Sequence, residues 1–242
     1  MIGLGTIINV LGIIAGGLFG KLFGRFLKER YQDTLSKACG VSVLFIGTAG
    51  ALEGMLTISE KSVVSGNSML IVISLALGAL LGELLNLEDK MEKFGKWLKV
   101  KTGNSKEKNF VDGFVTASLT VCIGAMAIVG SIQDGIFGDY SILATKAVLD
   151  FIIILVMTCS MGKGCIFSAI PVAVFQGIIT LLARFISPLM TDSALANLSL
   201  IGSVLIFCVG INLVWGKKIR VANLLPAIVI AVIIAFLPFS IG

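Results

Sequence analysis

The sequence predicts an all-α fold, a polytopic transmembrane helical bundle with about eight spans. Of the 242 residues, 57% are hydrophobic and only 14% are charged, and the mean hydropathy is +1.04, which leaves too little polar surface for a soluble domain of this size. The apolar residues also form runs of about 20, the length that a helix needs to cross a bilayer core. Because these runs lack the period-two alternation of a membrane β-barrel, helices are expected.

Short charged or Gly/Ser/Asn-rich segments separate the apolar runs. The runs lie at 3–20, 38–56, 68–86, 111–131, 142–161, 165–184, 198–215 and 224–241. They leave no room for a soluble domain, so residues 1–242 are expected to form a single integral membrane domain. The fifth and sixth runs are joined only by residues 161–164, which predicts a helical hairpin. The first run lacks a basic segment before it, which argues against a cleaved secretory signal.

The basic residues are strongly segregated between alternate loops. Short loops rich in lysine and arginine stay in the cytoplasm, and 16 of the 19 basic residues follow the first, third, fifth and seventh runs. Only Lys61, Lys146 and Arg184 fall elsewhere. An even number of spans with these loops inside places both termini outside the cytoplasm.

The third loop, at about 87–109, has an amphipathic pattern. Leu87, Met91, Phe94 and Leu98 recur at helical spacing beside Trp97, and lysines and glutamates fill the other positions. This pattern predicts a helix on the cytoplasmic membrane surface, with a solvated connector as the alternative.

Charge and composition exclude several classes of function. The net charge of +5 comes from basic residues between apolar runs rather than on one soluble face, so no nucleic-acid partner is expected. The five cysteines lie in or beside apolar runs, as buried small side chains do, and the chain has no histidine. We therefore expect no metal site, no cofactor and no enzymatic activity.

Glycines at spacings of four predict a helix-packing face in the first run. Gly12, Gly16, Gly20 and Gly24 stack on one side of a helix, where they let another backbone approach closely. The partner is either another span of the chain or a second subunit in a homo-oligomer.

Lys146 and Asp150 are the most unusual residues in the apolar runs. They lie four apart in the fifth run, share one helix face and can neutralise each other. Ionisable groups at membrane depth usually face a bundle interior or a watery cavity, so the pair is a candidate substrate-binding or ion-pathway site. The alternative is a purely structural ion pair.

Other polar residues are weaker candidates for the same pathway. Asn9, Gln176 and Asn212 lie within runs, either as interhelical hydrogen-bonding groups or as ligands. Gln133 and Asp134 lie in residues 130–135, whose flanking glycines predict a tight turn that ends the fourth span and could meet a solute.

Two further patterns are typical of transporters. Pro171 is expected to interrupt the sixth span, either as a simple kink or by freeing carbonyl groups that line a cavity. Aligning spans one to three with spans six to eight places the two copies in opposite orientations, which predicts an inverted repeat.

The whole chain resembles an uncharacterised bacterial membrane-protein family, domain of unknown function 554. The most specific stretches are 124–135, 146–150, 168–172 and 219–226. The resemblance implies a location in the bacterial inner (plasma) membrane and carries no activity.

Two functions of different class follow from these observations. The first is a small-solute or ion transporter or channel, favoured by the polar residues at membrane depth. The alternative is a non-transporting scaffold or partner subunit assembled through its glycine faces. The expected partners are the lipid bilayer, an unknown small solute or ion, and a second copy of the chain.

Overall fold

The computed structural model describes residues 2–59 and 62–236 and confirms the all-α fold class. The α-helices are Leu4–Gly24 (α1), Glu29–Met55 (α2), Ser68–Leu85 (α3), Leu87–Lys101 (α4), Phe110–Cys122 (α5), Ala125–Phe137 (α6), Ser141–Met161 (α7), Ala169–Leu181 (α8), Ala183–Ile186 (α9), Asp192–Trp215 (α10), Val221–Leu224 (α11) and Pro226–Ile234 (α12). Two 3₁₀ helices, Lys163–Ser168 (η1) and Ser187–Leu189 (η2), flank α8 and α9. Strands Leu56–Ser59 (β1) and Ser62–Ser65 (β2) pair antiparallel.

Within the described residues, six helical segments are long and apolar enough to cross a membrane: α1, most of α2, α3, α7, η1 together with α8, and α10. α5 and α6 together form a seventh, bent by 63°. The eighth predicted run begins as α11 and α12, and its last residues, 237–241, lie outside the described residues. The count of eight spans therefore stays a prediction.

The main helix break lies in the fourth span rather than in the sixth. α5 ends at Cys122 and α6 begins at Ala125, after Gly124 with a φ of 146° that favours glycine. Pro171 instead lies in the first turn of α8, where its missing N–H costs little. The predicted interruption of the sixth span at Pro171 is thus replaced by a junction between η1 and α8 just before it.

Residues 130–135 do not form the predicted turn. They lie inside α6, and the chain turns only at Gly138, whose φ is 69°. The apolar residues of this segment continue the helical pattern of α6, and its two glycines, Gly130 and Gly135, are compatible with a helix that packs closely on its neighbours.

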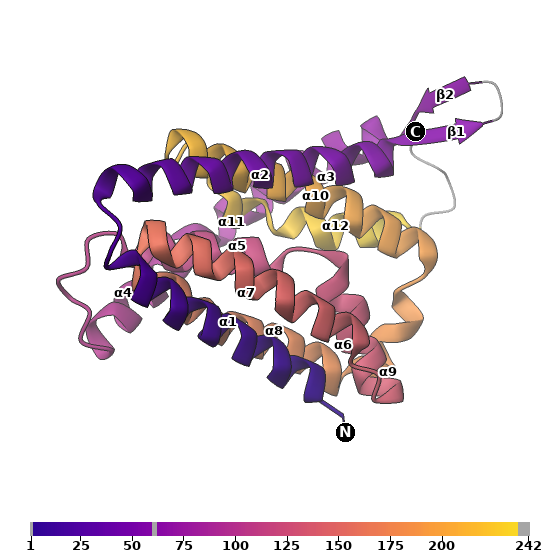
Figure 1. The fold of residues 1–242 in the computed structure, drawn as a ribbon. Coiled ribbons are helices and arrows are strands. Elements are labelled where there is room, and N and C mark those ends of the chain that lie inside the picture. The colour runs from indigo at the N-terminus through magenta and orange to yellow at the C-terminus, as the bar shows by residue number, and fades with distance from the viewer. Residues whose placement is uncertain (1, 60–61, 237–242) are drawn as a thin grey trace.

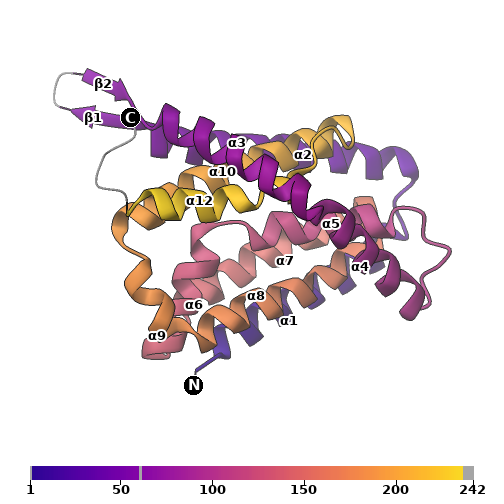
Figure 2. The ribbon, with the colours of Figure 1, turned by 180° about the vertical axis from the view of Figure 1, so that it is seen from behind.

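The long helices run roughly along one direction, so the connections gather at two ends (Figure 1; Figure 2). The turn between α1 and α2, helix α4, the start of η1 and the connection from α10 to α11 lie at one end, on the left of Figure 1. We call it the lysine-rich end, because the basic loops 21–37, 90–108, 163 and 217–220 belong to it. The start of α1 and the β1–β2 hairpin lie at the opposite, N-terminal end.

Close helix packing uses glycines of the same chain. Gly12, Gly16, Gly20 and Gly24 of α1 face Ala147, Phe151, Leu155 and Cys159 of α7. Both sets of numbers rise together, so the two helices are parallel. Gly40, Gly47, Gly50 and Gly54 of α2 face Leu213, Phe207, Ser203 and Leu200 of α10, and here the helices are antiparallel. α3 packs in the same way on α11 and α12.

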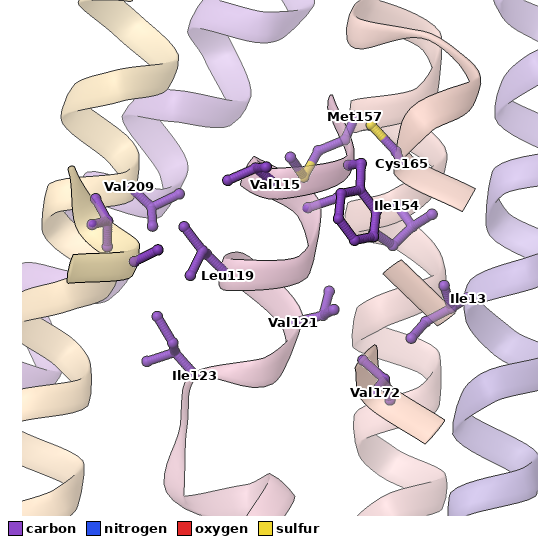
Figure 3. Packing of buried hydrophobic residues seen from close by; sticks show 14 of the residues in the cluster. Ile13, Val115, Leu119, Val121, Ile123, Ile154, Met157, Cys165, Val172 and Val209 are labelled. Atoms are coloured by element: carbon purple, nitrogen blue, oxygen red, sulfur yellow. The ribbon is translucent and has the colours of Figure 1, made fainter. Parts of the chain in front are cut away.

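α5 is the central helix of the hydrophobic core. Val115, Leu119 and Val121 of α5 lie between Val209 of α10 on one side and Ile154 of α7 on the other (Figure 3). A helix buried on most of its sides needs apolar residues around most of its circumference, and the sequence of α5 supplies them.

The predicted amphipathic helix is α4, which ends at Lys101. Leu98 is buried toward the bundle, whereas Trp97 and Val100 are exposed. Phe94 stacks on Trp97 and meets Phe114 of α5 edge-on, with ring centroids 5.8 Å apart. This arrangement suits a helix that lies along a membrane surface.

Candidate functional site

The centre of the candidate site is the ion pair on α7. The ammonium of Lys146 donates hydrogen bonds to both carboxylate oxygens of Asp150, at 2.8 and 2.6 Å. The two side chains are only 9% and 4% exposed. They lie on the buried face of α7 together with Leu143, Ala147 and Ile154, so the pair points into the bundle rather than into lipid.

Asn9 of α1 and Gln176 of α8 approach the same region. The hydroxyl oxygens of Thr6 and Thr180 lie 3.4 Å apart, so these two residues lie opposite each other on α1 and α8. One turn farther along each helix lie Asn9 and Gln176, both fully buried, and Asn9 also approaches the carboxylate of Asp150. Neither amide atom of either residue has a hydrogen-bond partner within the described part of the chain.

Asp134 is brought to this region by α6. One carboxylate oxygen accepts a hydrogen bond from the Gly5 N–H at 3.0 Å, and the other has no partner among the described residues. Gly135 packs against the backbone carbonyl of Thr180, which fixes α6 on α8. We call this set the polar cluster; it comprises Thr6, Asn9, Asp134, Lys146, Asp150, Gln176 and Thr180.

The other two predicted site residues are not placed in the polar cluster. Gln133 precedes Asp134 on α6 but is only half-buried. Asn212 lies near the lysine-rich end, where its side-chain N–H donates to the Ile219 carbonyl at 2.7 Å and its oxygen accepts from the Lys218 and Ile219 N–H groups at 2.9 Å. The Asn212 amide thus closes the connection from α10 to α11.

A cavity of about 500 Å³ opens near the lysine-rich end, among α2, α4, α5 and α10. Its charged lining is mainly acidic: Asp33, Glu88, Glu92 and Asp112 face it, together with Lys217. Along α5 it extends to Leu119, and the next turn holds Cys122, which is close enough to Lys146 and Asp150 to interact electrostatically with both. Lys146 and Asp150 themselves do not line the cavity.

A set of polar contacts holds α4 onto α11 at the mouth of this cavity. The Glu88 N–H donates to the side-chain oxygen of Asn223 at 2.7 Å, and the Glu88 carboxylate accepts from the Ala222 N–H at 2.9 Å. Lys217 pairs with Glu88 at 3.0 Å and also with Glu92. We call these contacts the α4 latch.

The electrostatics of the α4 latch follow from these pairs. The hydrogen bond from Lys217 holds the pKa of Glu92 below its ordinary value. Desolvation lowers the pKa of Lys217, but the hydrogen bonds to Glu92 and Glu88 outweigh it and raise the pKa above the ordinary value.

Sequence reasoning missed Glu88, Asn223, Thr6 and Thr180. Single threonines are common in apolar helices, and the sequence around Thr6 and Thr180 gives no sign that the two side chains face each other. The position of Glu88 in the first turn of α4 favours an acidic residue there, but it does not indicate that the carboxylate binds the Ala222 N–H of α11.

Comparison with known proteins places the chain in a family. The model of a family described as "Protein of unknown function (DUF554)" matches residues 4–236. The chain belongs to this family. Its similar proteins include the "Uncharacterized membrane protein YdfK" of Bacillus subtilis (strain 168), 30% identical over 98% of both chains, and the "Uncharacterized protein YqgA" of Escherichia coli (strain K12), 29% identical over 94% of both chains.

No solved structure matches this DUF554 chain. The family match and the printed name of YdfK agree with the apolar spans in identifying a membrane protein. Neither relative's name states an activity.

Proposed function

We propose that this DUF554 protein moves a small solute or ion across the bacterial inner membrane, as a transporter or channel whose pathway runs through the polar cluster. The observation that carries the proposal is a set of five buried polar atoms without hydrogen-bond partners in the described structure, on Asn9, Asp134 and Gln176. Buried polar groups are nearly always satisfied, so an unsatisfied group needs an explanation. A pathway that takes up water, a solute or an ion supplies one.

The position of the polar cluster supports a pathway. Asp134 and Thr6 lie toward the N-terminal end of the bundle, and the acidic cavity opens near the lysine-rich end. Along the chain, the break after Cys122, where α5 and α6 meet, separates Leu119 in the cavity lining from Asp134. Broken helices at membrane depth commonly line the sites of transporters, because their ends expose backbone groups.

The topology in the proposal follows from the loops. With the lysine-rich end in the cytoplasm, an even number of spans leaves both termini outside. An inverted repeat that relates spans one to three with spans six to eight is part of the same proposal. It pairs α2 with α10, which pack antiparallel and closely at the glycines of α2.

The alternative function, a non-transporting scaffold, draws less support. A scaffold of this kind requires glycine faces that other subunits can reach. Gly12, Gly16 and Gly20 instead pack against α7 of the same chain. A homo-oligomer would need another surface. We propose no enzymatic activity, cofactor or nucleic-acid partner.

Reconstitution into liposomes tests the proposal. Purified protein should let at least one probe from a panel of radiolabelled monovalent cations and small neutral solutes enter faster than protein-free liposomes do. The Gln176→Leu variant should lose this flux, because it removes a buried amide from the proposed pathway. Phe175→Leu changes a partly exposed neighbour on the same helix and should keep it. Wild-type liposomes as impermeable as empty ones to the whole panel would reject the proposal.

A further inference from the structure

The charges of the polar cluster do not balance within the described structure. Lys146 and Asp150 neutralise each other through two short hydrogen bonds. Asp134 is fully buried and forms no salt bridge with any described residue. When its carboxylate is ionised, the first turn of α1 supplies partial positive charge through the Gly5 N–H, but no described cationic side chain balances the negative charge. Buried charges are normally paired with an opposite charge or with a metal ion.

The hydroxyl oxygens of the two threonines have a spacing that fits two ligands of one ion as well as a long hydrogen bond. Their hydroxyl oxygens are 3.4 Å apart, beyond the usual O–H···O distance of about 2.7–2.8 Å. Two oxygens that bind one ion at right angles, each about 2.4 Å away, are about 3.4 Å apart. A ligand distance of that size is typical of calcium and of sodium, which has nearly the same radius.

The carboxylate of Asp134 lies next to this threonine pair. Gly5, which donates to one Asp134 oxygen, directly precedes Thr6 in the chain. Gly135, which directly follows Asp134, packs on the backbone carbonyl of Thr180. The second Asp134 oxygen has no hydrogen-bond partner in the described chain and is available as a ligand.

The oxygen atoms around this position favour a hard monovalent cation as the ligand. One turn inward, Asn9 and Gln176 add buried amide oxygens, and carboxylate, hydroxyl and amide oxygens are the preferred ligands of hard cations. No group of three or more His, Cys, Asp or Glu side chains among the described residues could hold a metal ion, so a divalent ion would lack the charges it needs. One uncompensated carboxylate matches a single positive charge.

We propose that the polar cluster binds one sodium ion, with Asp134, Thr6 and Thr180 as its central ligands. A proton on Asp134 would also remove the net charge, whereas a sodium ion would in addition give the second Asp134 oxygen and the two threonine hydroxyl oxygens a common partner. The inference deepens the proposed function by naming a cation for the pathway. It rests on that function only for the movement of the ion, because binding can occur without transport.

Thermal unfolding of the purified, detergent-solubilised protein tests the ion site. Replacing choline chloride with sodium chloride at constant ionic strength should raise the melting temperature of the wild type until the site saturates, because a ligand of the folded state stabilises it. Asp134→Asn and Thr6→Val should each raise the sodium concentration for half-maximal stabilisation by about tenfold or more. Asp192→Asn, which changes an exposed aspartate of α10, is the matched control and should behave like wild type.

The outcomes separate this inference from the proposed function. The ion site is overturned if sodium does not change the melting temperature of the wild type. It is also overturned if the melting temperatures of wild type and Thr6→Val depend equally on sodium. A melting temperature that does not respond to sodium, and whose pH dependence changes in Asp134→Asn, overturns the ion site and assigns a proton to Asp134 instead. Thr6→Val keeps the test decisive if Asp134→Asn fails to fold. Sodium-dependent stabilisation without any flux in liposomes supports the ion site and rejects transport.

Discussion

At the scale of single residues, the structure shows how two charges can be buried in a lipid-embedded bundle. Each charged side chain near the middle of a membrane helix costs about 2.5–3.5 kcal/mol on insertion scales. Lys146 and Asp150 offset this cost by pairing within one helix turn, with two hydrogen bonds of 2.8 and 2.6 Å. Either residue without the other would leave an unpaired charge in the bundle and destabilise the fold.

Neutralising Asp150 tests this dependence. Asp150→Asn should lower the free energy of unfolding by about 3–5 kcal/mol, because it leaves the Lys146 ammonium buried without a partner. Adding Lys146→Met should restore most of the stability. If the pair also lies on the pathway, the double variant should remain inactive in the liposome flux assay. Melting temperature and flux are measured on both single variants and the double variant.

The outcomes distinguish a structural pair from a functional one. A double variant that recovers both stability and flux would make the pair purely structural. An Asp150→Asn protein that is both stable and active would remove Asp150 from the site altogether.

At the scale of elements, close helix packing depends on the positions of glycines, which have no side chain to separate the two backbones. α1 lies on α7 because its glycines leave a groove for the backbone of the facing helix. α2 and α10 use the same device in the antiparallel direction. These contacts place Asn9 of α1 opposite the ion pair of α7, so the packing face also positions the candidate site.

Filling the α1 groove should therefore disturb the fold of the single chain. A Cβ at Gly16 would collide with the backbone carbonyl of Phe151, so Gly16→Leu should lower the free energy of unfolding by about 1–3 kcal/mol or more. Leu18→Ala is the control, since Leu18 is 54% exposed and has little packing to lose. Thermal melts in detergent compare the two. Gly16→Leu that melts like wild type would contradict the proposed role of this groove.

The α4 latch gives a pH-dependent contribution to stability. Because the pKa of Glu92 is lowered from 4.5, its contribution is present above pH 4.5 and is lost as the pH falls through the lower folded-state value. Because the pKa of Lys217 is raised from 10.5, its contribution is present below pH 10.5 and is lost as the pH rises through the higher folded-state value. The latch should therefore be strongest between these two limits.

Lys217→Met should remove this contribution. We expect a loss of about 0.2–1 kcal/mol near neutral pH, since Lys217 is partly exposed and solvent screens its pairs. The loss should shrink in acid, where Glu92 becomes protonated. Lys218→Met is the control, because no salt bridge of Lys218 occurs in the described structure. Melting temperatures measured across pH test this, and superimposable profiles for Lys217→Met and wild type would refute it.

At the scale of the whole molecule, the arrangement of helices separates two chemically different ends. The lysine-rich loops gather at one end, whereas the N-terminus of α1 and the β1–β2 hairpin lie at the other (Figure 1). α1 and α7 are parallel, as the predicted first and fifth spans must be if α5 and α6 together cross once.

Accessibility labelling tests the orientation of the whole chain. Cysteines placed at Lys96 and Lys217 should react with a membrane-impermeant thiol reagent only from the cytoplasmic side, and reporters fused to both termini should report from outside. The parent protein with its five native cysteines supplies the labelling background. A cytoplasmic report from either terminus would show that the span count is wrong.

The sequence by itself determined the features that depend on local pattern. Hydropathy marked the membrane helices, glycine spacing marked one face of α1, and the four-residue spacing of Lys146 and Asp150 placed them on one side of α7. Each of these depends only on helix periodicity and the solvent preference of side chains. The family resemblance, carried by motifs spread over the whole chain, is confirmed by the match to residues 4–236.

Only the tertiary structure decided which distant residues meet. Pro171 looked like the break, but the chain bends at Gly124, because a proline in a first helical turn disrupts nothing whereas a positive φ ends the helix. Asp134 looked like part of a turn, yet α6 carries it to Gly5, 129 residues away in the chain. Such convergence depends on how whole helices pack, and hydropathy and spacing describe each helix without its neighbours.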